Sequence, residues 1–391
     1  MQLCSVILIC IMYNRYEIEK CLMKVGLLMY NMFHIVVMLV GTMILSLILT
    51  PLVRKLAFKI GATDKPDARR VNKKEMPTIG GLAVYLAFFI AMFFMLPIPF
   101  GQVFPLFLGA TVIIVTGLID DIKELSPKMK LAGIIIAALI IYFMADIRMD
   151  MVTIPFFGAF KLGWLSFPVT LIWILAITNA VNLIDGLDGL ATGVSIIALT
   201  TMGIIGYFFL TVASINIPIM IFALVAALIG FLPYNFYPAK IFLGDTGALF
   251  LGFMISVMSL QGLKNVTFIS VIIPIVILGV PITDTIYAML RRKLNNKPIS
   301  SADKMHLHHR LMSLGLTHRQ TVLAIYSLAI IFSFTALLYK VSNLWGSVFL
   351  TVGLLFGLEL FVELIGLVGE NHQPLLSRFK KFAKKNNQEE K

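Results

Sequence analysis

The chain has 391 residues, of which 59% are hydrophobic and only 13% are charged, and its formal net charge is +12. A soluble domain is usually about a quarter charged, so this composition excludes an ordinary soluble protein and indicates a membrane protein. In such a chain the positive charge sets orientation and attracts anionic membrane lipids, and it gives no argument for a nucleic-acid partner.

Apolar runs long enough to cross a bilayer, which takes roughly 20 residues, recur along the chain. We therefore predict an all-α polytopic membrane protein with about eleven transmembrane helices in one domain, residues 33–368. The run at 131–145 is short and requires Lys128 and Lys130 to extend outward to the membrane surface. The predicted spans are 33–53, 79–99, 103–119, 131–145, 167–184, 189–212, 215–232, 246–263, 267–290, 321–340 and 345–368.

Two terminal segments lie outside this domain. Residues 1–32 form an N-terminal extension whose apolar run LCSVILICIM is too short to span and lacks the basic lead of a signal peptide. We expect the natural start to lie later, at Met23, Met29 or Met32. Residues 369–391 mix Leu and Phe with Lys, which is typical of a basic tail on a membrane surface.

The distribution of Lys and Arg predicts the orientation. With eleven spans the termini lie on opposite sides, and most of the 32 Lys and Arg residues fall in loops on the C-terminal side. This places the C-terminus in the cytoplasm and the N-terminus outside. The external loop 146–166 alternates around Gly158 and is predicted to form a small β-hairpin.

Unusual polar residues collect on the predicted cytoplasmic side. In NAVNLIDGLDGLATG, Asn179, Asn182, Asp185 and Asp188 recur at every third position and are interrupted by glycines. In a helix this spacing gives the first three side chains one broad face, which can grip a sugar, a ribose or a hydrated cation. A polar turn at a helix end is the simpler alternative for any single residue.

Three acids in other loops are candidates for the same site. Asp120 and Asp121 end an apolar run, where a solvated corner is the simple alternative, and Asp245 begins a span beside small residues in LGDTG. Together with Asp185 these carboxylates require a counter-charge. Hard oxygen ligands, with no cysteine beyond residue 32, indicate Mg²⁺ or Mn²⁺ rather than zinc.

The fifth cytoplasmic loop contains DKMHLHHRL, with His306, His308 and His309. His306 and His309 share a helical face, but the cytoplasmic motifs hold no other His or Cys except His318, so zinc is disfavoured. Imidazoles beside Lys304 and Arg310 favour an anion such as phosphate. A solvated basic loop is the alternative.

Carboxylates, a cation and basic loops at a membrane face predict phosphoryl transfer at a lipid headgroup. Two like unit charges at 4 Å repel by about 4 kcal/mol at an effective dielectric of roughly 20, and a divalent ion with nearby Lys and Arg would offset several such terms. A phosphate monoester has a second pKa near about 6 and is already largely dianionic at neutral pH. A general base at Asp120 or Asp121 would therefore contribute modestly.

Four motifs in series, LIDDIKELSP, NAVNLIDGLDGLA, FLGDTG and DKMHLHHRL, resemble those of the polyprenyl-phosphate N-acetylhexosamine-1-phosphate transferases, the MraY/WecA/TagO superfamily in glycosyltransferase family 4. The resemblance covers essentially residues 33–368. It implies a Mg²⁺-dependent enzyme of ten or eleven helices that transfers a sugar-1-phosphate from a UDP-sugar to undecaprenyl phosphate and releases UMP. A homodimer stays open.

The resemblance also implies roles for individual residues. Asp120 and Asp121 match the paired aspartates, one of them the proposed base or phosphate-orienting acid, and Asp245 matches the metal-binding aspartate. Asn182, Asp185 and Asp188 match the nucleotide and metal region, and the histidines match those that bind the diphosphate. The expected site is thus Asp120, Asp121 and Asp185 for catalysis, Asp245 and Asp185 for metal, and Lys74, Asn179, Asn182, Asp188, His306, His308, His309 and Arg310 for substrate.

Two further patterns look like the GlcNAc branch, especially the TagO-like enzymes that start wall teichoic acid. The chain has HLHH-RLMSLGLTHRQTV instead of HHH, and VPITDTIYAMLRR places Asp284 two turns before Arg291 and Arg292. The implied donor is UDP-GlcNAc, and a MurNAc-pentapeptide donor is disfavoured.

Two other functional classes are less consistent with the pattern. A secondary transporter or flippase would place ionisable residues near the membrane midplane, often in paired inverted repeats. Here the acids lie at helix ends on one side. A purely structural scaffold would leave the glycine-broken acidic motifs without a role.

Overall fold

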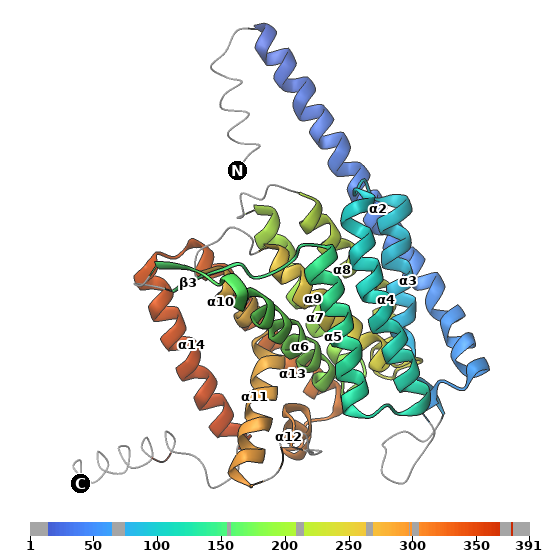
Figure 1. Cartoon of the computed structure of the whole chain (residues 1–391), viewed down its shortest axis with the longest axis vertical. Helices are drawn as coiled ribbons and strands as arrows, with labels where there is room; N and C mark the ends of the chain where they lie inside the picture. The colour runs from blue at the N-terminus through green and yellow to red at the C-terminus, as the bar shows by residue number, and fades with distance from the viewer. Residues whose placement is uncertain are drawn as a thin grey trace.

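The computed structural model describes residues 15–64, 75–154, 158–208, 215–262, 269–296, 298, 305–367 and 377. Figure 1 shows a bundle of long helices. The helices are α2 (Arg15–Ile60), α3 (Gly80–Ile90), α4 (Phe100–Lys123), α5 (Pro127–Met144), α6 (Ser166–Ile184), α7 (Leu190–Phe208), α8 (Asn216–Asn235), α9 (Gly244–Gly262), α10 (Ile269–Ile277), α11 (Gly279–Leu294), α12 (Leu307–Ser313), α13 (His318–Val341) and α14 (Leu344–Ile365).

Short elements connect or extend these helices. A π-helical turn, η1 (Ala91–Met95), continues α3, and a 3₁₀ turn, η2 (Gly163–Leu165), precedes α6. The strands form two antiparallel pairs, which are β1 (Thr63–Asp64) with β2 (Met76–Pro77), and β3 (Met151–Ile154) with β4 (Gly158–Lys161).

The all-α polytopic membrane class is confirmed. Among the described residues, eight helices are long and apolar enough to cross a membrane. Three predicted spans have no counterpart among the eight. The spans 79–99 and 267–290 correspond to the shorter Gly80–Met95 and to a pair of helices that meets at Leu278, and the span 246–263 corresponds to α9, which is not among the eight helices. The eleven-span topology therefore stays a prediction.

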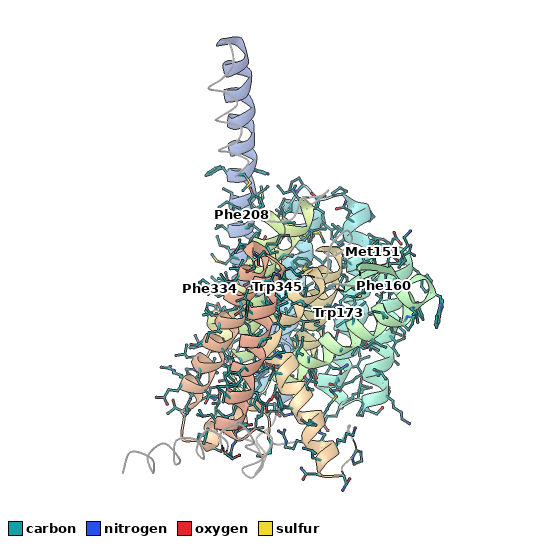
Figure 2. The ribbon with its side chains drawn as sticks, turned by 90° about the vertical axis from the view of Figure 1, so that its left-hand side faces the viewer. Met151, Phe160, Trp173, Phe208, Phe334 and Trp345 are labelled. Carbon is teal, nitrogen blue, oxygen red and sulfur yellow. The ribbon has the colours of Figure 1, made fainter. Side chains whose placement is uncertain are left out.

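Large apolar side chains cover the outside of the bundle, as lipid contact requires. Phe208, Phe334 and Trp345 are each about two-thirds exposed and project from the helices in Figure 2. In a soluble protein such a surface would be an aggregation hazard, whereas in a bilayer it is the expected lipid-facing side.

Helix α2 is far longer than a bilayer requires. Its 46 residues would extend about 69 Å at 1.5 Å per residue, against a hydrocarbon core of roughly 30 Å. Its first part projects beyond the bundle in Figure 1, and Met32–Ile60 is the portion that qualifies as a span. The predicted domain boundary at residue 32 thus falls inside a continuous helix.

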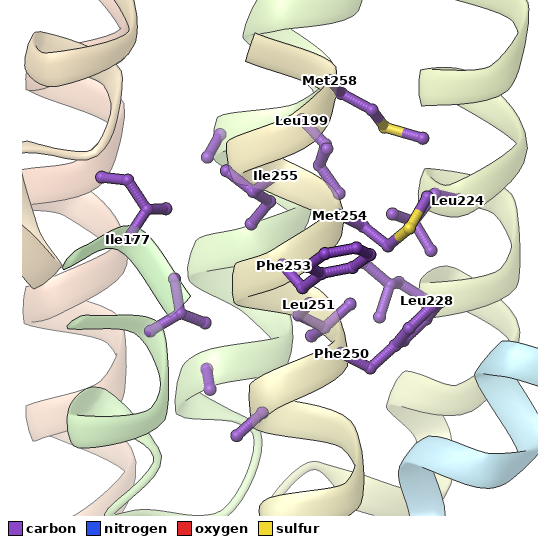
Figure 3. Packing of buried hydrophobic residues seen from close by; sticks show 14 of the residues in the cluster. Ile177, Leu199, Leu224, Leu228, Phe250, Leu251, Phe253, Met254, Ile255 and Met258 are labelled. Carbon is purple, nitrogen blue, oxygen red and sulfur yellow. The ribbon is translucent and has the colours of Figure 1, made fainter. Parts of the chain in front are cut away.

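Helix α9 lies at the centre of the bundle and packs against α3, α4, α6 and α7. Its side chains Phe250, Phe253 and Met254 are fully buried, and Figure 3 shows Met254 pointing toward Leu224 of α8. A helix that is apolar on every side is buried on every side. Because Asp245 stands in its first turn, this central helix fixes the position of that carboxylate.

Glycines let neighbouring backbones approach α9 closely. A Cβ added to Gly81 would fall 2.0 Å from the Cα of Gly247, and one added to Gly252 would fall 2.6 Å from the Cα of Thr178. Small residues at helix contacts are the usual means of close packing in membranes. Any side chain at these two positions would push α3 or α6 away from α9.

The predicted hairpin within 146–166 is confirmed. Strands β3 and β4 pair in the register Met151↔Lys161 to Ile154↔Gly158. Figure 1 shows this hairpin at the end of the bundle opposite to α12.

Candidate active site

A cavity of about 870 Å³ opens at the end of the bundle that carries α12. Its size lies within the range of small-molecule sites, about 300–1,000 Å³. Its wall is strongly acidic, and Lys123 is the one lysine of the described lining. The acids that line it are Asp64, Asp120, Asp121, Glu124, Asp185, Asp188 and Asp245.

Three distant segments meet at Asp245. Its Oδ1 accepts a hydrogen bond of 2.5 Å from Asn182 Nδ2, and its Oδ2 lies 3.2 Å from Lys130 Nζ. The same ammonium forms an ion pair with the buried Asp120, which also accepts from the backbone N–H of Leu125. The predicted convergence of Asp120, Asn182 and Asp245 is therefore present.

Lys130 corrects a sequence prediction. Its side chain was expected to extend outward to the membrane surface, but it lies between the carboxylates of Asp120 and Asp245. The physical reason is charge. Two acids brought together in a half-buried site attract the nearest ammonium, and Lys130 is in the first turn of α5, whose start Ser126 caps. No motif had marked Lys130 as a site residue.

Asp121 points to the start of α9. Its Oδ1 accepts from the backbone N–H of Asp245 at 3.1 Å, and its Oδ2 accepts from the N–H and the hydroxyl of Thr246 at 3.0 and 2.6 Å. Asp120 and Asp121 are adjacent in α4, yet Asp120 binds Lys130 whereas Asp121 binds the first turn of α9.

The NAVNLIDGLDGLATG segment divides into residues with different surroundings. Helix α6 ends at Ile184, and Asn182, Asp185 and Asp188 line the cavity. Asn179 instead donates to the carbonyl of Leu175 one turn back in α6, so the predicted shared face is only partly realised.

Asp185 and Asp188 differ in their bonding. No described residue donates a hydrogen bond to the Asp185 carboxyl, and burial together with the nearby carboxylates of Asp245 and Asp121 raises its pKa well above the usual range. Asp188 is tied down, because its Oδ2 accepts from the N–H of Ala239 and its own N–H donates to His318 Nε2. Asp185 is therefore the acid of this loop that is free to bind a cation.

The three histidines predicted to bind the diphosphate have different surroundings. His309 lines the cavity. His306 is buried, with Nδ1 2.7 Å from Asp284 Oδ2, while Asp284 Oδ1 accepts from the N–H of Leu307 and so caps α12. Asp284 thus attaches the histidine segment to α11.

His308 is 3% exposed and packs on the acidic loop, since a Cβ added to Gly186 would fall 2.4 Å from its ring. Burial, reinforced by His309 beside it, lowers the pKa of His308 to about 4. This histidine is neutral at physiological pH and cannot attract a phosphate by charge.

The two basic residues predicted to bind substrate, Arg310 and Lys74, are not part of the cavity wall that the structure describes. Arg310 donates through Nε to the carbonyl of Ile365 at the end of α14, and it is absent from the described lining. Lys74 lies outside the described residues.

Comparison with known proteins identifies the family. The glycosyl transferase family 4 model matches residues 103–263, which hold Asp120, Asp121, Asp185 and Asp245. A probable undecaprenyl-phosphate N-acetylglucosaminyl 1-phosphate transferase of Bacillus subtilis is 43% identical over 91% of this chain and 99% of its own. The chain belongs to glycosyl transferase family 4.

Relatives of lower identity carry two different names. A decaprenyl-phosphate N-acetylglucosaminephosphotransferase of Mycobacterium tuberculosis H37Rv is 33% identical over 70% of this chain and 74% of its own. A phospho-N-acetylmuramoyl-pentapeptide-transferase of Clostridium perfringens SM101 is 30% identical over 77% and 94%. The family resemblance read from the four motifs is confirmed.

The acids of this family 4 site fit a hard divalent cation. The acids of the lining offer carboxylate oxygens and Asn182 offers an amide oxygen as metal ligands, and no described residue donates a hydrogen bond to the Asp185 carboxyl. Those residues form no cluster of three His, Cys, Asp or Glu that could hold a metal by itself. Mg²⁺ usually binds through one or two carboxylates with waters and substrate phosphates completing its shell, so this donor set is sufficient.

Two further lining residues of the family 4 site escaped the sequence analysis. The ring of Tyr237 stacks on His318 at 4.4 Å between centroids, and the guanidinium of Arg319 lies 5.5 Å from the Tyr237 centroid. Tyr237 and His318 both line the cavity. His318 was visible as one more histidine, but Tyr237 lies in a loop with no periodic signal.

Proposed function

We propose that this protein transfers GlcNAc-1-phosphate from UDP-GlcNAc to undecaprenyl phosphate, giving undecaprenyl-diphospho-GlcNAc and UMP. The observation that carries the proposal is the 43% identity, over 91% of the chain, with a relative named for this transfer. The relative named for MurNAc-pentapeptide transfer is 30% identical, which favours a GlcNAc donor.

In the proposed reaction an oxygen of the acceptor phosphate attacks the β-phosphorus of UDP-GlcNAc. The bond from that phosphorus to the bridging oxygen breaks, and UMP leaves with the bridging oxygen. The acceptor is largely dianionic at neutral pH, so no obligatory deprotonation precedes attack. The main task of the site is to bring two phosphorylated reactants together and offset their repulsion.

The side chains of the cavity can divide this task. Asp245 and Asp185 would hold Mg²⁺, or Mn²⁺ in its place, and the ion would supply positive charge against the diphosphate. Asn182 fixes the orientation of Asp245. Lys130 pairs with both Asp120 and Asp245 and would supply positive charge to an incoming phosphate, while Asp120 would hold the proton of a monoanionic acceptor.

We further propose a location and a role in the cell. The protein would lie in the bacterial cytoplasmic membrane with eleven spans and with its site facing the cytoplasm. The concentration of Lys and Arg in the loops at the site end supports this orientation. The product would begin wall teichoic acid or another surface glycan, and a homodimer is compatible with it.

One assay tests the proposed function. Purified protein with undecaprenyl phosphate and Mg²⁺ should release UMP from UDP-GlcNAc and far less from UDP-MurNAc-pentapeptide. Asp245→Asn should insert normally and release none, and a chelator should stop turnover. Equal use of both donors would refute the GlcNAc assignment. Solute uptake by proteoliposomes without UMP release would favour a transporter.

A further inference from the structure

We propose that Asp121 is a positioning residue, which fixes the metal-binding Asp245 by capping α9 from outside that helix. The inference rests on the proposed function and separates Asp121 from its neighbour Asp120. The family resemblance groups the two aspartates as one pair, whereas their contacts in the folded chain differ.

The Asp121 carboxylate is bound almost entirely to the start of α9. It accepts three hydrogen bonds, and all three donors belong to the first residues of α9 after Gly244, namely Asp245 and Thr246. A carboxylate offers about four lone-pair positions, so most of its accepting capacity is used. A general base needs a free lone pair directed at the acceptor, and about one such position remains on this carboxylate, against three used for the cap.

The N-terminus of α9 has no cap from its own neighbouring residues. The first N–H groups of a helix have no partner inside it, and a side-chain oxygen usually caps them from the residue just before the helix. Here Leu243, the residue just before α9, has an apolar side chain that cannot accept a hydrogen bond, and the first residue, Gly244, has no side chain. Gly244 has φ of 72°, and a Cβ there would fall 1.7 Å from the carbonyl oxygen of Thr78. The cap must come from elsewhere in the chain, and Asp121 of α4 supplies it.

Helix α4 packs closely against α9 next to this cap. A Cβ added to Gly117, one turn before Asp121, would fall 2.5 Å from the Cα of Thr246. The two backbones are thus in contact next to the cap, and Thr246 is fully buried. Asp121 lies one turn further along α4, and its hydrogen bonds to Asp245 and Thr246 hold the first turn of α9 in one orientation relative to α4.

The cap determines where Asp245 points. Asp245 donates its own N–H to Asp121, and its side chain then reaches Asn182 and Lys130. Loss of the cap would release two N–H groups in the first turn and let that turn fray. It would also free the positive end of the α9 dipole to bind a phosphate in a competing position.

Thr246 provides a matched pair of variants that leaves both aspartates intact. Thr246→Val removes only the hydroxyl that donates to Asp121, and Thr246→Ser keeps it. Asp121→Asn removes the charge and one of the two acceptor oxygens. The direct readout is Mn²⁺ affinity of the detergent-purified full chain without substrates, measured by electron paramagnetic resonance, with UMP release as a second readout.

We expect Asp121→Asn to weaken Mn²⁺ binding roughly tenfold and Thr246→Val roughly threefold, as the loss of one to a few hydrogen bonds would. Thr246→Ser should restore wild-type affinity, and high metal should recover much of the turnover of Thr246→Val. Wild-type Mn²⁺ affinity in Asp121→Asn and Thr246→Val would overturn the inference. Absence of UMP release by the wild type would refute the proposed function, while the Mn²⁺ comparison would still decide the role of Asp121.

Discussion

Lys130 lies 3.2 Å from Asp245, although 115 positions separate the two residues in the chain. Its ammonium also pairs with Asp120, so one positive charge holds together the ends of α4, α5 and α9. This bridge occupies the space beside Asp245, one of the two acids proposed as ligands of a divalent cation. It therefore offsets part of the negative charge of the site and competes with a cation for Asp245.

Replacement of Lys130 should separate these two effects. Lys130→Met removes the competing ammonium, so we expect Mn²⁺ to bind several-fold more tightly, since more uncompensated negative charge remains. Turnover should fall at least tenfold, because no ammonium remains to meet the acceptor phosphate. The measurements are Mn²⁺ titration and the rate of UMP release at saturating metal.

Lys128→Met is the matched control for this prediction. Lys128 lies in the same turn of α5 but is exposed, so its loss should leave both metal affinity and turnover near wild type. Equal losses of turnover in the two variants would mean that the positive charge of the turn matters, and not the bridge made by Lys130.

Some parts of this site could be predicted from the sequence and others could not. Asp120, Asp185 and Asp245 were identifiable because acids that interrupt apolar runs carry a high cost unless they have a function. Lys130 was not, since a lysine at a helix start has an ordinary role at a membrane surface. Its true partner depends on how α4, α5 and α9 pack, and no local pattern encodes that.

The histidine segment illustrates the same limit. The sequence grouped His306, His308 and His309 as one anion cradle, and the structure gives each a different neighbour. The distinction comes from Asp284, which belongs to α11 and reaches α12 only in the folded chain. Helix positions were easier to predict, because apolar length alone nearly fixes them.

The buried His308 should make the protein less stable in mild acid. Its pKa is lowered to about 4 by burial and by His309, whereas an unfolded chain takes up this proton near pH 6.5. Between these values the unfolded state binds more protons than the folded state, so stability is present above pH 6.5 and is lost as the pH falls toward 4. The full loss is at most about 3 kcal/mol.

Thermal unfolding in detergent at pH 7.0 and pH 5.0 measures this effect. From pH 7.0 to pH 5.0 the melting temperature should fall further for the wild type than for His308→Gln, whose side chain does not titrate. Comparison with that variant removes the contributions of the carboxyl groups, which both proteins share. Parallel losses in the two proteins would show that His308 does not determine the acid sensitivity.

Asp284 should matter for stability and for the donor site together. Asp284→Asn keeps one acceptor oxygen but gives up the charge-assisted contacts to His306 and to the start of α12, and it should cost about 1–3 kcal/mol. Because α12 carries His309 into the cavity, the KM for the UDP-sugar should rise more than the KM for the lipid. Steady-state kinetics with each substrate varied in turn gives the comparison.

The contrary result for Asp284 is also informative. A lower melting temperature with both KM values unchanged would mean that the segment keeps its position without the cap. Asp146→Asn is a suitable control, since Asp146 pairs with Arg148 on an exposed surface beside the hairpin and should affect neither quantity.

Gly186 provides the sharpest test of the contact between the acidic loop and the histidines. A methyl group at this position would lie 2.4 Å from two atoms of the His308 ring, so Gly186→Ala must displace either the ring or the loop that carries Asp185. Small-to-large changes in packed sites typically cost about 1–3 kcal/mol, and here the displacement also moves a predicted cation ligand. We expect weaker Mn²⁺ binding and a fall in turnover of at least tenfold.

Gly101→Ala is the matched control, because a Cβ at that position in α4 meets no atom within 4 Å. It should leave turnover unchanged, and its melting temperature should be equal to or above that of the wild type. The double variant Gly186→Ala with His308→Ala then isolates the clash. If removal of the ring restores metal binding to Gly186→Ala, the packing of His308 on the loop is what holds Asp185 in place. Failure of the double variant to recover would locate the damage in the backbone of the loop itself.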